Sequence, residues 1–266
     1  YVASGSTPSK DSFVEKGVPY IKMYNLRNQK IDFNFHPQYI TREANDKVTI
    51  IPGIELSSEI DDFEIHILGY FINIDDDKLN ETVNSLKKER IKRVELIIEK
   101  LKEQGVYLNI EDIMKNNLCI GRAHIANEIV RCGYEENFKS AFLKYLIKGK
   151  PAYVKGNKLT YKKALKIIND ANGIAVLAHP GKIYRSMSIE KIVKELKCYG
   201  LKGIEVYHPS HTKEQVNLFY NLSKKYKLLI TGGSDFHDES NKEMSIGSDG
   251  INEVLLNKLL NSKCIK

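Results

Sequence analysis

The chain has 266 residues, of which 42% are apolar, and it carries a formal net charge of +7 at pH 7. This length and composition allow one sizeable core or two modest ones and exclude a largely disordered protein. No apolar run approaches the ~20 residues of a membrane span, and no signal peptide is visible, so we expect a cytoplasmic protein. The positive charge favours anionic partners such as nucleotides, nucleic acid or phosphate, although a Lys-rich surface also follows from the composition of some organisms.

Residues 1–46 are polar, rich in aromatic residues and irregular in pattern. Proline and glycine interrupt this segment repeatedly, and only short strands are predicted, over residues 20–23 and 30–33. The chain begins with Tyr1 rather than Met, which predicts a fragment whose true start lies upstream.

The hydrophobic pattern changes at Lys47. Residues 48–51 predict a short β-branched strand that stops at Pro52 and Gly53, and residues 64–70 predict a second strand. Residues 75–150 are predicted to be almost entirely helical, with a long first helix that ends at Gly105. Shorter helices are expected over residues 110–115, 121–131 and 136–148. Because no strand signal interrupts them, we expect a helical insert.

Strands and helices alternate again after Pro151. Strands are predicted over residues 173–179, 203–208 and 228–231. Helices are predicted over residues 160–171, 189–199, 213–225 and 252–260. This alternation implies an α/β fold with a largely parallel sheet or barrel. Active sites of such folds lie at the carboxyl ends of the strands.

Side chains able to bind metals lie on or just after the predicted strands. Five of the seven histidines do so, together with Glu55 and Asp235. Divalent metals prefer imidazole and carboxylate ligands held by rigid elements. A single histidine on an apolar strand is usually a core residue, but repetition at successive strand ends favours a metal site. The four cysteines lie far apart without a C-x-x-C pair, so we expect free thiols in a reducing compartment.

Seven motifs carry a resemblance to a known family. They are PGIELS (52–57), HILGYF (66–71), GRAHIA (121–126), KGKPAYV (148–154), LAHPG (177–181), EVYHPSH (205–211) and TGGSDFH (231–237). From about residue 47 onward the chain resembles PHP (polymerase and histidinol phosphatase) proteins of the TrpH-like branch. The resemblance implies a distorted (β/α)7 barrel over residues 47–74 and 151–266, with a helical insert over residues 75–150. It also implies hydrolysis of nucleotide or short nucleic-acid phosphate esters by three divalent metal ions, with Mn, Zn, Fe and Mg all as candidates.

The resemblance implies a role for each matching residue. Glu55 resembles the carboxylate that bridges two metals, and His66 and His179 resemble the other ligands of the second metal. Asp235 resembles a ligand of the first metal and His237 a ligand of the third. Arg122 and His124 resemble contacts to the substrate phosphate, although Arg122 is equally typical of a surface helix. His208 and His211 fit either a pocket wall or a solvent-exposed loop, and we favour solvent.

Two motifs of the family are missing. Its H-x-H and T-D-H motifs should precede Lys47, but His36 is the only histidine before His66. We therefore expect a barrel without its first two strands, one retained metal instead of three, and impaired hydrolysis. The sequence leaves open whether the chain is an active enzyme or a catalytically dead, metal-binding remnant of the family.

The first 46 residues instead resemble the start of a target-recognition domain from type I restriction specificity subunits. The residues that carry this resemblance are ASGSTPS (3–9), GVPYIK (17–22), NL (25–26) and YITRE (39–43). We interpret this segment as foreign, and favour an accidental join of two coding sequences over a functional fusion. A DNA-binding specificity module is the alternative function, which residues 1–46 and the positive charge would support.

Overall fold

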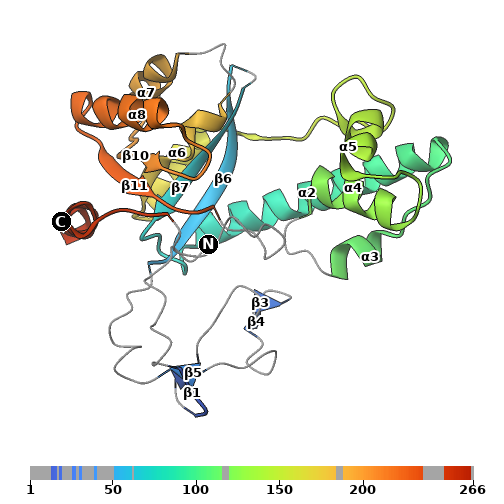
Figure 1. Cartoon of the computed structure of the whole chain (residues 1–266), viewed down its shortest axis with the longest axis horizontal. Coiled ribbons are helices and arrows are strands. Elements are labelled where there is room, and N and C mark those ends of the chain that lie inside the picture. Colours follow the sequence, from blue (N-terminus) through green and yellow to red (C-terminus); the bar gives the residue numbers. More distant parts are fainter. Residues whose placement is uncertain are drawn as a thin grey trace. The chain divides into compact units, whose positions relative to one another are not determined.

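The computed structural model describes residues 13–16, 18–19, 26–27, 30–31, 39–40, 51–61, 63–115, 120–183, 188–235 and 249–264 (Figure 1). The chain divides into two compact units. We call the described residues of 51–80 and 158–264 the sheet unit, and those of 81–157 the helical unit.

Short strands make up most of what is described in the first 46 residues. They are β1 (Phe13–Val14), β2 (Val18–Pro19), β3 (Leu26–Arg27), β4 (Lys30–Ile31) and β5 (Tyr39–Ile40). β1, β5 and β2 form one small sheet, and β3 pairs with β4. The strand predicted over residues 30–33 is therefore confirmed at its first two positions, whereas residues 20–23 lie outside the described residues.

The sheet unit is built on a six-stranded mixed sheet. Its strands are β6 (Gly53–Ile60), β7 (Phe63–Tyr70), β8 (Leu159–Thr160), β9 (Ile174–Leu177), β10 (Gly203–Tyr207) and β11 (Leu229–Gly232). Their order across the sheet is β11-β10-β9-β7-β6-β8. β9, β10 and β11 run parallel, but β7 is antiparallel to both β6 and β9. The expected parallel arrangement is wrong for β6 and β7, because the short turn between them can join only antiparallel strands.

β6 begins where the sequence predicted a strand to end. Its first residue is Gly53, so the predicted strand end at Pro52 and Gly53 is wrong, while residues 48–50 lie outside the described residues. Positions two apart are buried along the strand, as expected for one face of a sheet: Leu56, Ser58 and Ile60. A serine within this buried row disguised the alternation, although its hydroxyl donates to the carbonyl of Ile65.

Four helices of the sheet unit lie close to their predicted positions. They are α6 (Tyr161–Asp170), α7 (Ile189–Cys198), α8 (Lys213–Lys225) and α9 (Glu253–Cys264). Three of them, α6, α8 and α9, pack on the sheet, while α7 packs against α6. α6 begins after Thr160, whose hydroxyl accepts a hydrogen bond from the amide of Lys163 and so caps the helix. It packs against β6, β7 and β9, while α8 covers β10 and β11. All four residues of β9 are buried, so the core runs through the strand that precedes His179.

The helical unit confirms the predicted helices. It contains most of α2 (Asp77–Glu103), then α3 (Ile110–Lys115), α4 (Arg122–Arg131), α5 (Phe138–Ala141) and a short π-helix (Phe142–Leu146). Gly105 follows α2 with a φ of 76°, a left-handed conformation that favours glycine. Apolar residues of α2, α4 and the π-helix form one buried cluster. No described helix is long and apolar enough to cross a membrane.

Candidate metal centre

Glu55 and His66 face each other across the hairpin of β6 and β7. In the antiparallel register, Glu55 is opposite Leu68 and His66 is opposite Ser57. Glu55 and His66 therefore occupy diagonal positions on one face of the sheet, within reach of each other's side chains. Oε1 of Glu55 lies 2.7 Å from Nδ1 of His66. The hairpin register thus creates the first half of the candidate site.

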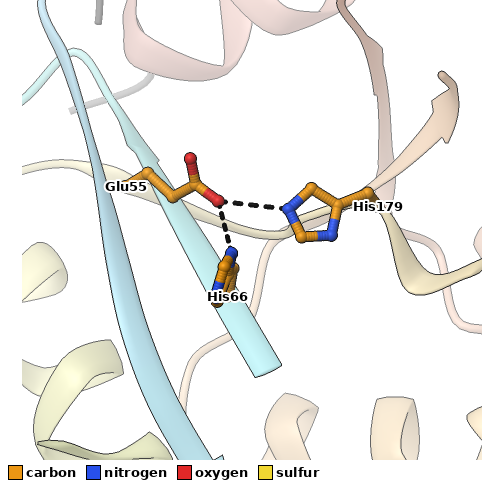
Figure 2. A group of neighbouring side chains, drawn as sticks. All are labelled: Glu55, His66 and His179. Carbon is orange, nitrogen blue, oxygen red and sulfur yellow. Dashed lines mark hydrogen bonds and ion pairs between the residues drawn. The ribbon is translucent and has the colours of Figure 1, made fainter. Parts of the chain in front are cut away.

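His179 enters the same site from the end of β9. The amide of Ala178 donates to the carbonyl of His66 at 3.0 Å, which extends the pairing of β7 with β9 by one residue. His179 then adopts a φ of 25°, which residues other than glycine rarely adopt. Its Nε2 lies 3.1 Å from Oε1 of Glu55, and Figure 2 shows both rings pointing to this one oxygen. Such strained backbone is concentrated at functional sites.

The three side chains suit a divalent metal ion. One potential ligand atom from each of Glu55, His66 and His179 lies within 4.8 Å of the other two. Ligands bound about 2.0–2.1 Å from a tetrahedral ion are roughly 3.4 Å apart. The separations of 2.7 and 3.1 Å would therefore need to open by roughly 0.7 and 0.3 Å. Two imidazoles and one carboxylate leave coordination positions free for water or substrate.

The protonation states of this group follow from its hydrogen bonds. Burial alone would raise the pKa of Glu55, but the hydrogen bonds with His179 and His66 lower it to about 2. Burial would lower the pKa of His66, yet its hydrogen bonds to Glu55 and Glu64 raise it to about 9. At pH 7 without metal, Glu55 is a carboxylate and His66 an imidazolium. Metal binding must displace the His66 proton, because only a neutral imidazole offers a lone pair.

Glu64 supports the far side of the His66 ring. Its Oε1 lies 3.4 Å from Nε2 of His66, and its Oε2 accepts from Nζ of Lys158 at 2.7 Å. The hydrogen bond to His66 is the main reason that the pKa of Glu64 falls to about 2. Metal-binding histidines usually have such a carboxylate on the second nitrogen. Glu64 was not predicted from the sequence, although its position two residues before His66 places it on the same face of β7.

Asp235 lies just after β11, and its carboxylate is close to the side chains of Lys182 and His208. Its Oδ2 lies 2.7 Å from Nζ of Lys182 and 3.5 Å from Nε2 of His208. Like His179, Asp235 has a positive φ, here 49°. His237 lies outside the described residues, so its predicted place beside Asp235 stays a prediction.

His208 is buried, and the interpretation of this residue as solvent-facing is wrong. Its side chain is 1% exposed. The amide of Ser210 donates to Nδ1 of His208 at 3.0 Å, so the turn after β10 holds the ring inward. Nε2 of His208 is buried, has no hydrogen-bond partner within the described residues and lies 3.5 Å from Oδ2 of Asp235.

His211 supports the turn that follows His179. Its Nδ1 donates to the carbonyl of Val206 at 2.9 Å, and its Nε2 accepts from the amide of Gly181 at 3.2 Å. Burial lowers the pKa of His211, so the ring is neutral at pH 7. A Cβ atom on Gly181 would lie 2.5 Å from Cδ2 of His211. The favoured solvent-facing role is therefore wrong for His211 as well.

Arg122 and His124 lie at the start of α4 in the helical unit. The Nη1 atom of Arg122 donates to the carbonyl of Leu146 at 3.1 Å, and its guanidinium lies over the rings of Phe142 and Tyr153. Nδ1 of His124 accepts from the amide of the residue before α4 at 3.0 Å. Both side chains thus have local partners. Their predicted contact with a substrate phosphate stays a prediction.

The comparisons with known proteins identify the relatives of the chain. No protein-family model matches it. The 5′-3′ exoribonuclease of Haemophilus influenzae is 30% identical over 194 residues, which cover 71% of this chain and 70% of that protein. The chain belongs to the family of this exoribonuclease. The chain is also similar to the 3′,5′-nucleoside bisphosphate phosphatase of Chromobacterium violaceum (29% over 194 residues) and to the 5′-3′ exoribonuclease Rnm of Escherichia coli (29% over 193 residues).

Each of these two matches covers 71% of this chain, and they cover 68% of the phosphatase and 66% of the exoribonuclease Rnm. The chain thus spans about two thirds of the length of the curated relatives that it matches.

Solved structures support the same fold. An amidohydrolase from Chromobacterium violaceum with bound sulfate and no metal has a TM-score of 0.68 and 26% identity, over 80% of this chain and 76% of that one. A protein assigned as a metal-dependent phosphoesterase from Bifidobacterium adolescentis has a TM-score of 0.71 and 22% identity, over 82% and 79%.

Proposed function

We propose that the chain is a metal-dependent phosphoesterase of the PHP type that acts on nucleotide or short nucleic-acid phosphate esters. The convergence of Glu55, His66 and His179 on one point is the observation that carries this proposal. The named activities of the relatives, an exoribonuclease and a bisphosphate phosphatase, support the substrate class. The sulfate bound by the related amidohydrolase supports a site for a tetrahedral oxyanion.

The chemistry follows from the residues present. A divalent ion bound here would polarise a phosphoryl oxygen and lower the pKa of a water molecule. Glu55 would contribute the negative charge and the two imidazoles the neutral ligands, while Glu64 keeps the His66 ring oriented. The ammonium of Lys182, beside Asp235, would attract the anionic phosphate.

The remaining predicted roles belong to the same proposal. Asp235 and His237 would correspond to ligands of a first and a third metal site that this chain leaves incomplete, and Arg122 and His124 would contact the substrate phosphate. The strained backbone of Asp235 supports the first role. The aromatic rings that hold the Arg122 guanidinium support the second, because a fixed guanidinium binds phosphate with two parallel hydrogen bonds. The (β/α)7 barrel over residues 47–74 and 151–266, with an insert over residues 75–150, completes this proposal.

We also propose that these 266 residues hydrolyse phosphate esters only weakly and bind one metal ion. The sequence contains neither the H-x-H nor the T-D-H motif, and only Glu55, His66 and His179 form a complete three-ligand set among the described residues. Phosphate-ester hydrolysis is among the slowest uncatalysed reactions, and clustered metals stabilise the attacking and leaving oxygens together. Loss of a second metal would therefore reduce turnover by orders of magnitude.

The test is metal content and phosphate release from a nucleoside 3′,5′-bisphosphate. The chain would be assayed beside a version in which residues 1–46 are replaced by a family-type segment with both motifs. We expect one ion and slow turnover for the first, and more metal and faster turnover for the second. Equal metal content and equal turnover would contradict the proposed impairment. Absence of both metal and turnover from both proteins would contradict the proposed phosphoesterase. Metal without turnover in the first protein would show a dead remnant.

A further inference from the structure

Glu205 is a buried acid beside the candidate site, without an assigned role so far. It lies in the middle of β10 and is 5% exposed. Its Oε2 accepts a hydrogen bond of 2.6 Å from the backbone amide of His179. The group formed by Glu55, His66 and His179 does not include it. Burial of a carboxyl group costs free energy unless the group is hydrogen-bonded, so the buried position of Glu205 depends on this contact with His179.

The end of β9 explains why the amide of His179 is directed to Glu205. β10 pairs with β9 only as far as Leu177, opposite Ile204. Beyond that point the backbone turns away, and His179 takes up its positive φ of 25°. The amide of His179 therefore points to the Glu205 carboxyl rather than to a strand carbonyl. The contact fixes the backbone at the residue whose ring reaches Glu55.

The same turn is held at a second point. The amide of Gly181 donates to His211, and His211 in turn donates to the carbonyl of Val206, the residue that follows Glu205. β10 and its following loop thus hold the His179 turn from one side at two of its amides. A strained backbone conformation persists only where several contacts from the surrounding structure hold it in place.

We propose that Glu205 is a positioning residue for the metal centre, which holds the backbone of His179 so that its imidazole meets Glu55. This inference rests on the proposed metal-dependent function. Partners that orient a metal ligand from behind typically change metal affinity about 10–100-fold when they are removed. Loss of the Glu205 acceptor should therefore weaken metal binding although Glu205 does not bind the ion.

The test compares three variants of the full chain. Glu205→Met removes the acceptor but keeps the side-chain volume, and Glu205→Gln keeps an acceptor oxygen at the same length. Ser223→Ala is the matched control, because it removes a different buried hydrogen bond of the sheet unit, from Ser223 to the carbonyl of Phe219. The readouts are Mn²⁺ affinity by calorimetry and hydrogen exchange of the His179 amide in the metal-free protein.

We expect Glu205→Met to lower Mn²⁺ affinity about 10–100-fold and to speed exchange of the His179 amide. Glu205→Gln and Ser223→Ala should stay close to the wild type in both measurements. Wild-type affinity and exchange in Glu205→Met would overturn the inference, as would equal losses in Ser223→Ala. If the wild type binds no Mn²⁺, the proposed function fails, while exchange at His179 still decides whether Glu205 holds this turn. If Glu205→Met does not fold, a loss of affinity in Glu205→Asp, whose carboxyl is one methylene shorter, supports the inference, and its absence contradicts it.

Discussion

Glu55 and His66 share a hydrogen bond of 2.7 Å although they are 11 residues apart and lie on different strands. The antiparallel hairpin places them diagonally on one face of the sheet. The pair is more than half-buried, with side chains 13% and 29% exposed. In the metal-free protein it therefore behaves as a coupled ion pair that stabilises the folded state within a limited range of pH.

The sign of that pH dependence follows from the two shifts. The pKa of His66 rises from 6.5 to about 9, so its contribution is complete below pH 6.5 and is lost as the pH rises through 9. The pKa of Glu55 falls from 4.5 to about 2, so its contribution is present above pH 4.5 and is lost as the pH falls through 2. In the presence of a metal chelator, we expect the urea concentration at the midpoint of unfolding to decrease as the pH is raised from about 6 to about 9.5. This decrease should be larger for the wild type than for His66→Gln. Parallel profiles for the two proteins would show that the ion pair adds no stability.

The close contact between Gly181 and His211 gives a second prediction. A Cβ atom at Gly181 would lie 2.5 Å from the His211 ring, whereas one at Gly250 would have no neighbour within 4 Å. We expect Gly181→Ala to reduce the free energy of unfolding by about 1–3 kcal/mol, because overpacking forces side chains and backbone to shift. Gly250→Ala is the control and should change stability little. The measurement is urea unfolding, and similar values for both variants would contradict the prediction.

Metal affinity of the same glycine variants tests the link between turn and site. Gly181 lies two residues after His179, so displacement of the turn should move the imidazole away from Glu55. We expect Gly181→Ala to bind Mn²⁺ about 10-fold more weakly and Gly250→Ala to bind it as the wild type does. A loss of stability without any loss of Mn²⁺ affinity would contradict the prediction, because it would show that the turn after His179 does not affect metal binding.

Arg122 provides a prediction about substrate binding. Its guanidinium lies over two aromatic rings, 5.4 Å and 5.9 Å from their centroids, and donates to a backbone carbonyl. Lysine keeps the charge but cannot form the planar, two-pronged contact with phosphate. We expect Arg122→Lys to raise the KM for a nucleoside 3′,5′-bisphosphate about 10-fold. Arg131→Lys, in the same helix and paired with Glu128, is the control. An unchanged KM in Arg122→Lys would mean that Arg122 only supports α4 and the π-helix.

The sequence predicted the residue types that gather at the candidate site but not all of its geometry. The position of His66 and His179 on or after predicted strands indicated a site shared with Glu55, and the family resemblance grouped the three as ligands of one metal. The boundary of β6 was wrong because Pro52 and Gly53 suggested a strand end, although the strand begins there. The antiparallel hairpin still brings Glu55 to His66, since a diagonal pair on one face has the same effect as adjacent strand ends.

The supporting contacts could not be predicted from sequence. Glu64 contacts Lys158 across 94 residues, Lys182 contacts Asp235 across 53, and Glu205 contacts His179 across 26. No local pattern encodes such pairs, because they depend on strand order and register. His208 was missed for a related reason. A histidine in a Pro- and Ser-containing loop suggests solvent exposure, and only the backbone turn at Ser210 shows that the ring folds inward.

The most direct test of the central claim is a Mn²⁺ titration of the metal-free wild type beside Glu55→Gln and Glu59→Gln. Glu59 lies on the same strand, four residues beyond Glu55, and is not part of the candidate site. We expect about one ion per chain for the wild type and Glu59→Gln, and at least about 100-fold weaker binding for Glu55→Gln, because the only carboxylate of the three-ligand set is lost. Equal binding by Glu55→Gln and the wild type would contradict a metal centre built from Glu55, His66 and His179.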